Sequence, residues 1–278
     1  MRNAPVYWPL VDLETMKECH IIMTYRLNRV PIKELVAQLE LDLLPALRNP
    51  HAISPTVPVL AILHFLSSRL FQVTVGLAAE MSQPKFSKVL QNVLDALLKL
   101  VNSYIRFPPR AELPTVKAVF YNISHIPHVI GAIDWTHIAL VPQRANELVY
   151  RNQKSDSGYP NLPWLLTLVR QLTTEGENRY NEVCGWMRRM IEMTFGLLKA
   201  RFCCLHVSVG ALQYRSGKVC KIVVACSMLN NLAFRIHVTL LEVGDIDAGA
   251  VVEAVNSDTE KADEAHDKRT DLIRHYFR

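Results

Sequence analysis

The residue whose chemistry most needs explaining is Asp134, which lies inside the apolar stretch VIGAIDWTHIALV at residues 129–141. The composition of this stretch predicts a strand. An ionised carboxylate among such neighbours is unfavourable unless a partner compensates its charge, because burial disfavours the charged form. A divalent cation is one possible partner, and neighbouring backbone N–H groups are another. Asp134 is therefore a candidate metal ligand with a purely structural alternative.

A second carboxylate, Glu192, lies on a helix predicted over residues 179–201. It borders the apolar stripe of that helix, so it can reach a strand packed underneath. Arg188, one turn earlier, offers the alternative of a surface ion pair worth roughly 0.3–0.5 kcal/mol. The stripe that we expect to be buried consists of Val183, Trp186, Met187, Met190, Ile191, Phe195 and Leu198.

Histidines and cysteines give weaker indications of a metal site. His125, His128 and His137 are close in sequence, but His128 and His137 have opposite parity on a continuous strand and would face opposite ways. We therefore expect them to be structural or surface residues. The six cysteines include no Cys-x-x-Cys pair, so buried free thiols are the better interpretation than a zinc site.

Residues 71–100 form a candidate helix-turn-helix with its turn at Ser82-Gln83-Pro84. Ser82 can cap a helix, and Pro84 suits the first turn. The buried stripe of the second helix is predicted to be Phe86, Val89, Leu90, Val93, Leu94 and Leu97. The opposite face carries Lys85, Ser87, Lys88, Gln91 and Asn92. These residue types can donate to phosphates or base edges, although a plain helical hairpin with a solvated face is the alternative.

The other elements that must position these residues are mostly helical. The fold class that we predict is α+β, dominated by helices. We expect helical pieces in 12–49 broken at Pro31 and Pro45, further helical spacing over 57–100, and helices at 116–123 and 217–236. Residues 142–178 are predicted to be largely loop. Residues 242–278 are predicted to be an acidic, flexible tail.

The charge distribution separates a basic body from that tail. Residues 1–241 contain 26 Lys and Arg against 16 Asp and Glu, whereas 242–267 contain nine acids and one Lys. A basic body is typical of proteins with polyanionic partners, and a solvated cationic surface is the alternative. No signal-peptide pattern or long uninterrupted apolar run is present, so we expect an intracellular, soluble protein with no membrane partner.

Several blocks in order resemble the PIF/Harbinger family of transposase-derived nucleases, a DDE-type group. They are SRLFQVTVGLAAEMSQPKFSKVLQNV, YIRFPPRAEL, VIGAIDWTHIAL, SDSGYPNLPWLLT, ENRYNEVCGWMRRMIEMTFGLLKARFCCL and GALQYRSGKVCKIVVACSMLNNLA. The resemblance extends to about Leu241. It implies an RNase H-like core in which three acids hold two divalent ions, Mg²⁺ or Mn²⁺, that cleave DNA phosphodiesters. Asp134 corresponds to the first acid and Glu192 to the third.

The same resemblance implies further partners. Positive side chains near the site would neutralise DNA phosphates, and these are Arg188, Arg189, Lys199 and Arg201. The family also implies a Myb-like partner protein and a location in the nucleus as well as the cytoplasm. No small-molecule substrate is expected.

The chain departs from the family pattern between its first acid and the SDSGYP block. About twenty residues separate Ile138 from Gly158, whereas three strands and their connections need roughly 30–50. The block that would carry the second catalytic aspartate is expected to be missing, and the segments that flank it should join near Lys154-Ser155. Asp156 is a weak substitute ligand because it matches the aspartate of the D-S-G-Y-P motif. We therefore predict impaired catalysis and weak stability, with a non-catalytic DNA-binding or partner-binding protein as the alternative.

These features predict three regions. A helical region with the helix-turn-helix occupies residues 1–114, and a truncated RNase H-like nuclease domain that lacks several central strands occupies 115–241. The acidic tail follows at 242–278.

Overall fold

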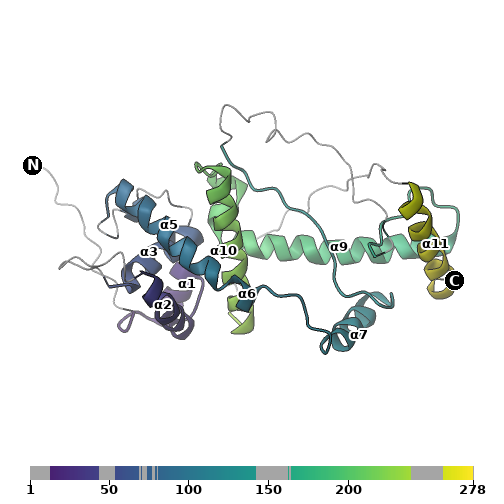
Figure 1. Cartoon of the computed structure of the whole chain (residues 1–278), viewed down its shortest axis with the longest axis horizontal. Helices are drawn as coiled ribbons and strands as arrows, with labels where there is room; N and C mark the ends of the chain where they lie inside the picture. Colours follow the sequence, from purple (N-terminus) through teal and green to yellow (C-terminus); the bar gives the residue numbers. More distant parts are fainter. Residues whose placement is uncertain are drawn as a thin grey trace, which may run out of the picture. The chain divides into compact units, whose positions relative to one another are not determined.

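The computed structural model describes residues 13–43, 54–68, 70, 74–76, 79, 81–141, 162, 164–238 and 259–277 (Figure 1). They divide into two compact units. Unit 1 comprises Met1–Arg106, His137–Glu147 and Gly196–Gly244, and unit 2 comprises Phe107–Thr136, Leu148–Phe195 and Asp245–Arg278. This division differs from the predicted regions, because the segments after residue 136 and residue 195 pack with the N-terminal helices.

Unit 1 is built from helices. Along the chain they are α1 (Glu18–Tyr25), α2 (Arg29–Leu43), α3 (Thr56–Ser67), α5 (Gln83–Lys99), α6 (Val101–Tyr104), the 3₁₀ helices η3 (Cys203–Leu205) and η4 (Val207–Val209), and α10 (Ser216–Arg235). Pro31 lies in the first turn of α2 and does not break it, since proline is tolerated where no intrahelical N–H partner is needed.

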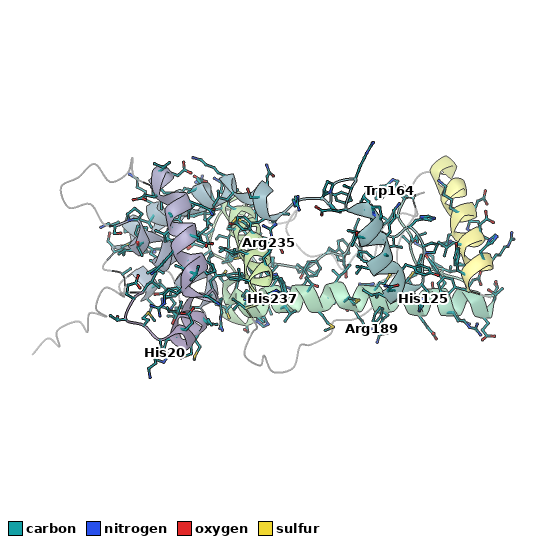
Figure 2. All side chains as sticks on the ribbon, turned by 90° about the horizontal axis from the view of Figure 1, so that it is seen from below. His20, His125, Trp164, Arg189, Arg235 and His237 are labelled. Atoms are coloured by element: carbon teal, nitrogen blue, oxygen red, sulfur yellow. The ribbon has the colours of Figure 1, made fainter. Side chains whose placement is uncertain are left out.

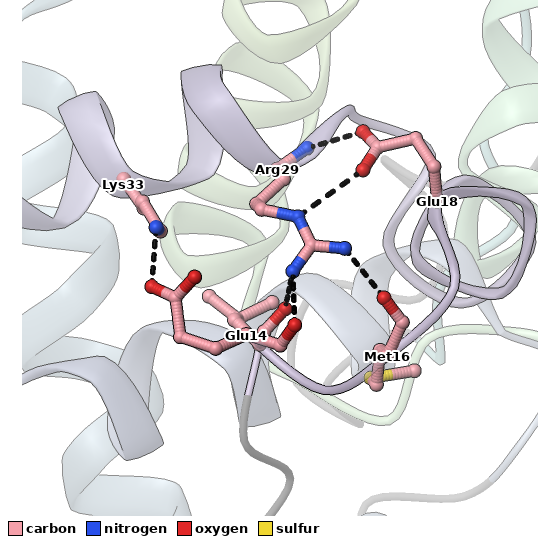
Figure 3. Close-up of polar contacts among 6 residues, drawn as sticks. Glu14, Met16, Glu18, Arg29 and Lys33 are labelled. Atoms are coloured by element: carbon pink, nitrogen blue, oxygen red, sulfur yellow. Dashed lines mark hydrogen bonds and ion pairs between the residues drawn. The ribbon is translucent and has the colours of Figure 1, made fainter.

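The connection between α1 and α2 is fixed by Arg29, the first residue of α2 (Figure 3). Its backbone N–H donates to Glu18 Oε1 at 2.8 Å, and its guanidinium donates to the carbonyl oxygens of Leu13, Glu14 and Met16. Lys33 forms an ion pair with Glu14. One side chain therefore ties the segment before α1 to the start of α2.

The core of unit 1 centres on α3, α5 and α10, and Figure 1 shows α5 and α10 side by side. The apolar stripe predicted for the second helix of the helix-turn-helix is confirmed on α5: its members are buried except Val89, which is partly buried against the core. By length and composition α10 could cross a membrane, but half of that apolar stretch is buried inside unit 1. A core helix passes the same test.

The cysteines are all free thiols, as predicted. Cys203, Cys204 and Cys226 are buried, and the sulfur atoms of Cys204 and Cys226 are 4.0 Å apart. Burial raises the pKa of the Cys226 thiol. Cys19 and Cys220 are exposed, so the expectation of burial is wrong for these two.

Unit 2 contains α7 (Leu113–Ser124), most of α9 (Glu175–Arg201) and α11 (Thr259–Tyr276). α9 begins four residues before the predicted start because Thr174 and Glu177 form a capping box. Glu177 Oε2 accepts from the N–H groups of Thr173 and Thr174 at 2.6 and 2.9 Å, and Thr174 Oγ1 accepts from the N–H of Glu177. The loop predicted over 142–178 is therefore wrong for residues 175–178.

The prediction of a flexible tail over 242–278 is also corrected by α11. Ile273 and Phe277 are buried in the core of unit 2 with Tyr180, Met187 and Ile126. Arg269 donates to the carbonyl oxygens of Thr167 and Leu168 at 3.4 and 3.3 Å. Apolar burial and these bonds hold the C-terminal helix in unit 2.

The strand predicted over 129–141 does not form. Residues 129–139 have no regular structure, and Leu140 makes an isolated parallel bridge to Leu212. Among the described residues only two such bridges occur and no sheet. A strand needs a hydrogen-bonding neighbour along its length, and apolar composition alone does not provide one. The described part of the chain is therefore mostly helical, without the expected β layer.

Unit 2 exposes many large apolar side chains. Trp186 and Met190, which were predicted to be buried on α9, are 42% and 41% exposed. Trp135 and Trp164 are also exposed, and Figure 2 labels Trp164. The prediction that α9 buries a full stripe is therefore wrong for these positions. Among the described residues no sheet covers this face of α9.

Candidate active site

Asp134 lies in the irregular segment of unit 2 with its side chain only 7% exposed. Its Oδ1 accepts a hydrogen bond from the N–H of Trp135 at 2.8 Å. Its Oδ2 is 3.5 Å from the guanidinium Nε of Arg188 on α9. The buried charge is therefore compensated by a backbone donor and a cation, because an unpaired carboxylate at this depth would be unstable.

Glu192 meets the same guanidinium. Its Oε1 lies 3.2 Å from Arg188 Nε, which is the predicted i,i+4 pair. Because Asp134 and Glu192 are both within 3.5 Å of one nitrogen, the structure brings the two predicted acids together around a single positive charge. All three residues belong to unit 2.

The two acids fit a hard divalent cation by the chemistry of their donors. Mg²⁺ prefers oxygen ligands and is usually held by one or two carboxylates, with waters and phosphate oxygens completing its coordination. A second ion would need further carboxylates, and the described residues hold no cluster of three or more metal-ligating side chains. Asp156, the predicted substitute ligand, lies outside the described residues.

The predicted phosphate contacts near the acids fall into distinct environments. Arg189, labelled in Figure 2, is exposed on α9 in unit 2. Lys199 belongs to unit 1, where its Nζ donates to the carbonyl oxygen of His137 at 3.0 Å and burial lowers its pKa. Arg188 is occupied by the two acids.

Arg201 is in the interior of unit 1. Its guanidinium donates to Asn230 Oδ1 at 3.1 Å, to the Val238 carbonyl at 2.9 Å and to the Arg26 carbonyl at 3.3 Å. Arg26 is the C-cap of α1, so this bond satisfies a carbonyl at a helix end. A guanidinium with these partners is not available to a phosphate, which corrects the prediction that Arg201 contacts DNA.

The residues predicted to contact DNA on α5 differ in their exposure and in their partners. Lys85 and Lys88 are exposed, and Asn92 is half-buried. Ser87 accepts hydrogen bonds from Lys218 of α10 at 3.2 and 3.4 Å, and Gln91 donates to Asp95 at 2.9 and 3.0 Å. Ser87 therefore contacts α10 through its backbone carbonyl and its hydroxyl, and its contact with DNA stays a prediction. Most of the first helix of the helix-turn-helix lies outside the described residues.

Sequence reasoning missed two lysines that complete this face. Lys218 and Lys221 project from α10 toward α5, where Lys221 pairs with Asp95 at 2.5 Å. Their spacing of three residues on a predicted helix was a usable signal, because such residues share one helix face. The three histidines predicted to be surface or structural residues, His125, His128 and His137, are all exposed.

The sequence of the chain was compared with known protein families, and one family model matches part of it. Residues 147–231, which include Arg188 and Glu192, match the family model described as DDE superfamily endonuclease. This part of the chain is therefore similar to the DDE superfamily endonucleases. The resemblance predicted from the sequence blocks is thereby confirmed. This superfamily generally uses divalent metal ions, which agrees with the donor chemistry of the two acids.

Individual DDE relatives cover most of the chain. The chain is 29% identical to the protein named Putative nuclease HARBI1 from Homo sapiens over 276 positions, 80% of this chain and 79% of that protein. It is 29% identical to the protein of that name from Bos taurus, and 25% identical to the one from Xenopus laevis over 95% of this chain and 92% of that protein. No solved structure matches the chain.

The alignment lengths also support an internal truncation relative to the DDE relatives. Because 80% of 278 residues is about 222, about 54 of the 276 positions aligned with the human protein have no counterpart here. That shortfall is slightly larger than the roughly 30–50 residues that three strands and their connections need.

Proposed function

We propose that this chain is a divalent-metal-dependent DNA nuclease derived from a Harbinger-type transposase, with Asp134 and Glu192 as its metal ligands. The observation that carries the proposal is the shared guanidinium, because it places two acids from distant parts of the chain around one cation. The match to DDE superfamily endonucleases supports the reaction class. We further propose a truncated RNase H-like ancestry and a helix-turn-helix built on α5.

The residues of the site have separable roles in this mechanism. Mg²⁺ or Mn²⁺, when bound, supplies activation of the attacking water and stabilisation of the leaving oxygen. Asp134 and Glu192 provide hard oxygen donors, and the Trp135 N–H fixes the orientation of the Asp134 carboxylate. Arg189, exposed on the same helix, can attract the DNA backbone.

We propose that catalysis is weak in this chain. The two-metal reaction relies on two ions that clamp the attacking and leaving oxygens. Two carboxylates carry too little negative charge to hold both ions closely, and the described residues offer no third acid beside them. Slow nicking is therefore the expected activity, with Asp134 and Glu192 as the residues that would hold a metal ion.

The test is a plasmid-nicking assay with the full chain and Mg²⁺ or Mn²⁺. Asp134→Ala and Glu192→Ala should each reduce nicking to the background rate. Glu182→Ala is the matched control, since Glu182 is an exposed acid on the same helix and is not one of the two acids that contact Arg188. Equal nicking by all four proteins would overturn the assignment of the site.

A second candidate is a non-catalytic DNA-binding protein, favoured by the absence of a third acid near the site among the described residues and by the exposed Lys85 and Lys88 on α5. Salt-dependent binding without cleavage would support it. Lys85→Ala or Lys88→Ala should lower the slope of log affinity against log salt by about 1. Lys99→Ala on the same helix is the control, because Lys99 is paired with Asp42.

We also propose a location in the nucleus and a partner protein for this chain. A chain that acts on or binds DNA requires access to the nucleus, and a Myb-like partner protein would assist both entry and targeting. Location of a tagged chain, with and without such a partner, tests this directly. Uniform exclusion from the nucleus in both conditions would contradict it.

A further inference from the structure

Arg188 is placed where a metal ion would have to bind. Its Nε is 3.5 Å from Asp134 Oδ2 and 3.2 Å from Glu192 Oε1, so one positive group faces both acids. The side chain of Asp134 is almost fully buried, and those of Arg188 and Glu192 are 29% and 28% exposed. The guanidinium therefore supplies the charge compensation that the buried acid needs.

We propose that Arg188 is an internal competitor of the divalent cation, so that metal binds Asp134 and Glu192 only when the Arg188 side chain leaves them. This inference rests on the proposed function. The physical reason is mutual exclusion. A bound ion would need carboxylate oxygens at about 2.0–2.6 Å, and the guanidinium already contacts those same oxygens. Two cations at such separation repel each other strongly in a poorly solvated site.

The exposed part of Arg188 provides a route for this displacement. A long side chain on a helix can move its head group into solvent by rotating its χ angles, while its stem stays in place. Once outside, the guanidinium can bind a phosphate in bidentate fashion, which is the geometry that arginine favours. A DNA phosphate and the metal ion therefore stabilise the same state of Arg188, and each should raise the affinity for the other.

The decisive measurement is Mn²⁺ affinity of the full chain, from the electron paramagnetic resonance signal of free Mn²⁺. Arg188→Gln should bind Mn²⁺ about tenfold more tightly than the unsubstituted chain, a coupling within the usual range. Arg189→Gln is the matched control, because it removes the same charge from the adjacent, exposed position. Equal gains in both variants would mean a general charge effect, and no gain in Arg188→Gln would mean that Arg188 does not compete; both outcomes overturn the proposal.

A short DNA duplex adds a second comparison. Duplex should raise the Mn²⁺ affinity of the unsubstituted chain more than that of Arg188→Gln, because only the former has a competitor to remove. An equal gain in the two proteins would show that phosphate does not act through Arg188. The comparison cancels any direct contribution of phosphate oxygens to the metal, since both proteins share it.

Two further measurements keep the inference distinct from the proposed function. Asp134→Asn should abolish saturable Mn²⁺ binding, and if no protein in the set binds Mn²⁺, the metal site and the inference both fail. If Arg188→Gln does not fold, nuclear magnetic resonance of the arginine Nε–H groups in the unsubstituted chain provides the answer. The Arg188 signal, assigned by its absence in Arg188→Lys, should shift as Mg²⁺ is added, and an unchanged signal at saturation would overturn the proposal.

Discussion

The two units of the molecule differ most in how they bury apolar surface. Among the described residues, the core of unit 1 contains 37 buried residues, whereas that of unit 2 contains five. In unit 2, large apolar side chains such as Trp135, Trp186 and Met193 remain exposed. Unit 1 is a packed helical domain, and unit 2 is a set of helices around a small cluster.

This contrast predicts that the candidate site lies in the less stable part of the chain. Asp134, Arg188 and Glu192 all belong to unit 2, the unit with the smaller buried cluster among the described residues. Local stability follows buried apolar contact, so unit 2 should open at a lower free energy than unit 1. A metal ion or DNA that binds the site would stabilise this unit by mass action.

The largest effect should come from truncating the core of unit 1. Phe202 is fully buried, so Phe202→Ala should lower the free energy of unfolding of unit 1 by about 3–5 kcal/mol. Trp186→Ala, at an exposed position in unit 2, should cost less than about 1 kcal/mol. Urea unfolding followed by circular dichroism measures both. Similar decreases in the free energy of unfolding for the two variants would contradict the difference in packing between the units.

A second test concerns the buried guanidinium of unit 1. Arg201→Met should lower the free energy of unfolding by about 2 kcal/mol, because Asn230 and two carbonyl oxygens would lose their donor. Burial and the nearby Arg26 lower the pKa of Arg201 to about 10. Arg189→Met is the control, since Arg189 is exposed. A stable Arg201→Met chain would show that this network is dispensable.

Two glycines on α9 test how closely α9 packs against the C-terminal end of α11 in unit 2. A Cβ at Gly176 would lie 2.6 Å from the Phe277 carbonyl oxygen, so Gly176→Ala should displace the end of α11 and cost about 1–2 kcal/mol. Gly185 has open space around it, and Gly185→Ala should stabilise the helix by about 0.5–1 kcal/mol. Hydrogen exchange of α11 amides would separate the two. Equal protection in both variants would mean that α11 does not need this close approach.

The smallest effect concerns pH. Hydrogen bonds from Thr173 and Thr174 lower the pKa of Glu177 from 4.5 to about 2. Because the folded pKa is depressed, the cap contributes fully above pH 4.5, and its contribution is lost as the pH falls from there through about 2. Glu177→Gln should remove this pH dependence from the helicity of α9, measured by circular dichroism. An unchanged acid profile would contradict the role of the cap.

The helices that sequence predicted well are those with an unbroken apolar repeat. α5 begins after Ser82 with Pro84 in its first turn, and α10 lies within one residue of its predicted bounds. α11 was missed because only Ile273 and Phe277 of its buried face stand out among many charges. The strand around Asp134 was predicted from composition, whereas strand formation depends on a partner, which the described residues supply at Leu140 alone within this segment.

The candidate site was also predictable only in part, because some of its contacts lie within one helix and others depend on tertiary packing. The pair of Arg188 and Glu192 follows from their spacing on one helix. The approach of Asp134 to the same guanidinium depends on tertiary packing, so the position of Glu192 beside the apolar stripe made it possible and the family resemblance indicated it. Arg201 was misassigned because its burial is set by the ends of α1 and α10, which no local pattern around Arg201 reveals.

The exposed tryptophans of unit 2 have a practical consequence. The chain has four tryptophans, and the three that the structure describes, Trp135, Trp164 and Trp186, all lie in unit 2 and face solvent. Once Trp8 is replaced by Phe, the intrinsic fluorescence of the protein reports on unit 2 alone. Quenching by iodide or a blue shift on addition of a ligand would then give an optical signal from the half of the molecule that carries the two acids.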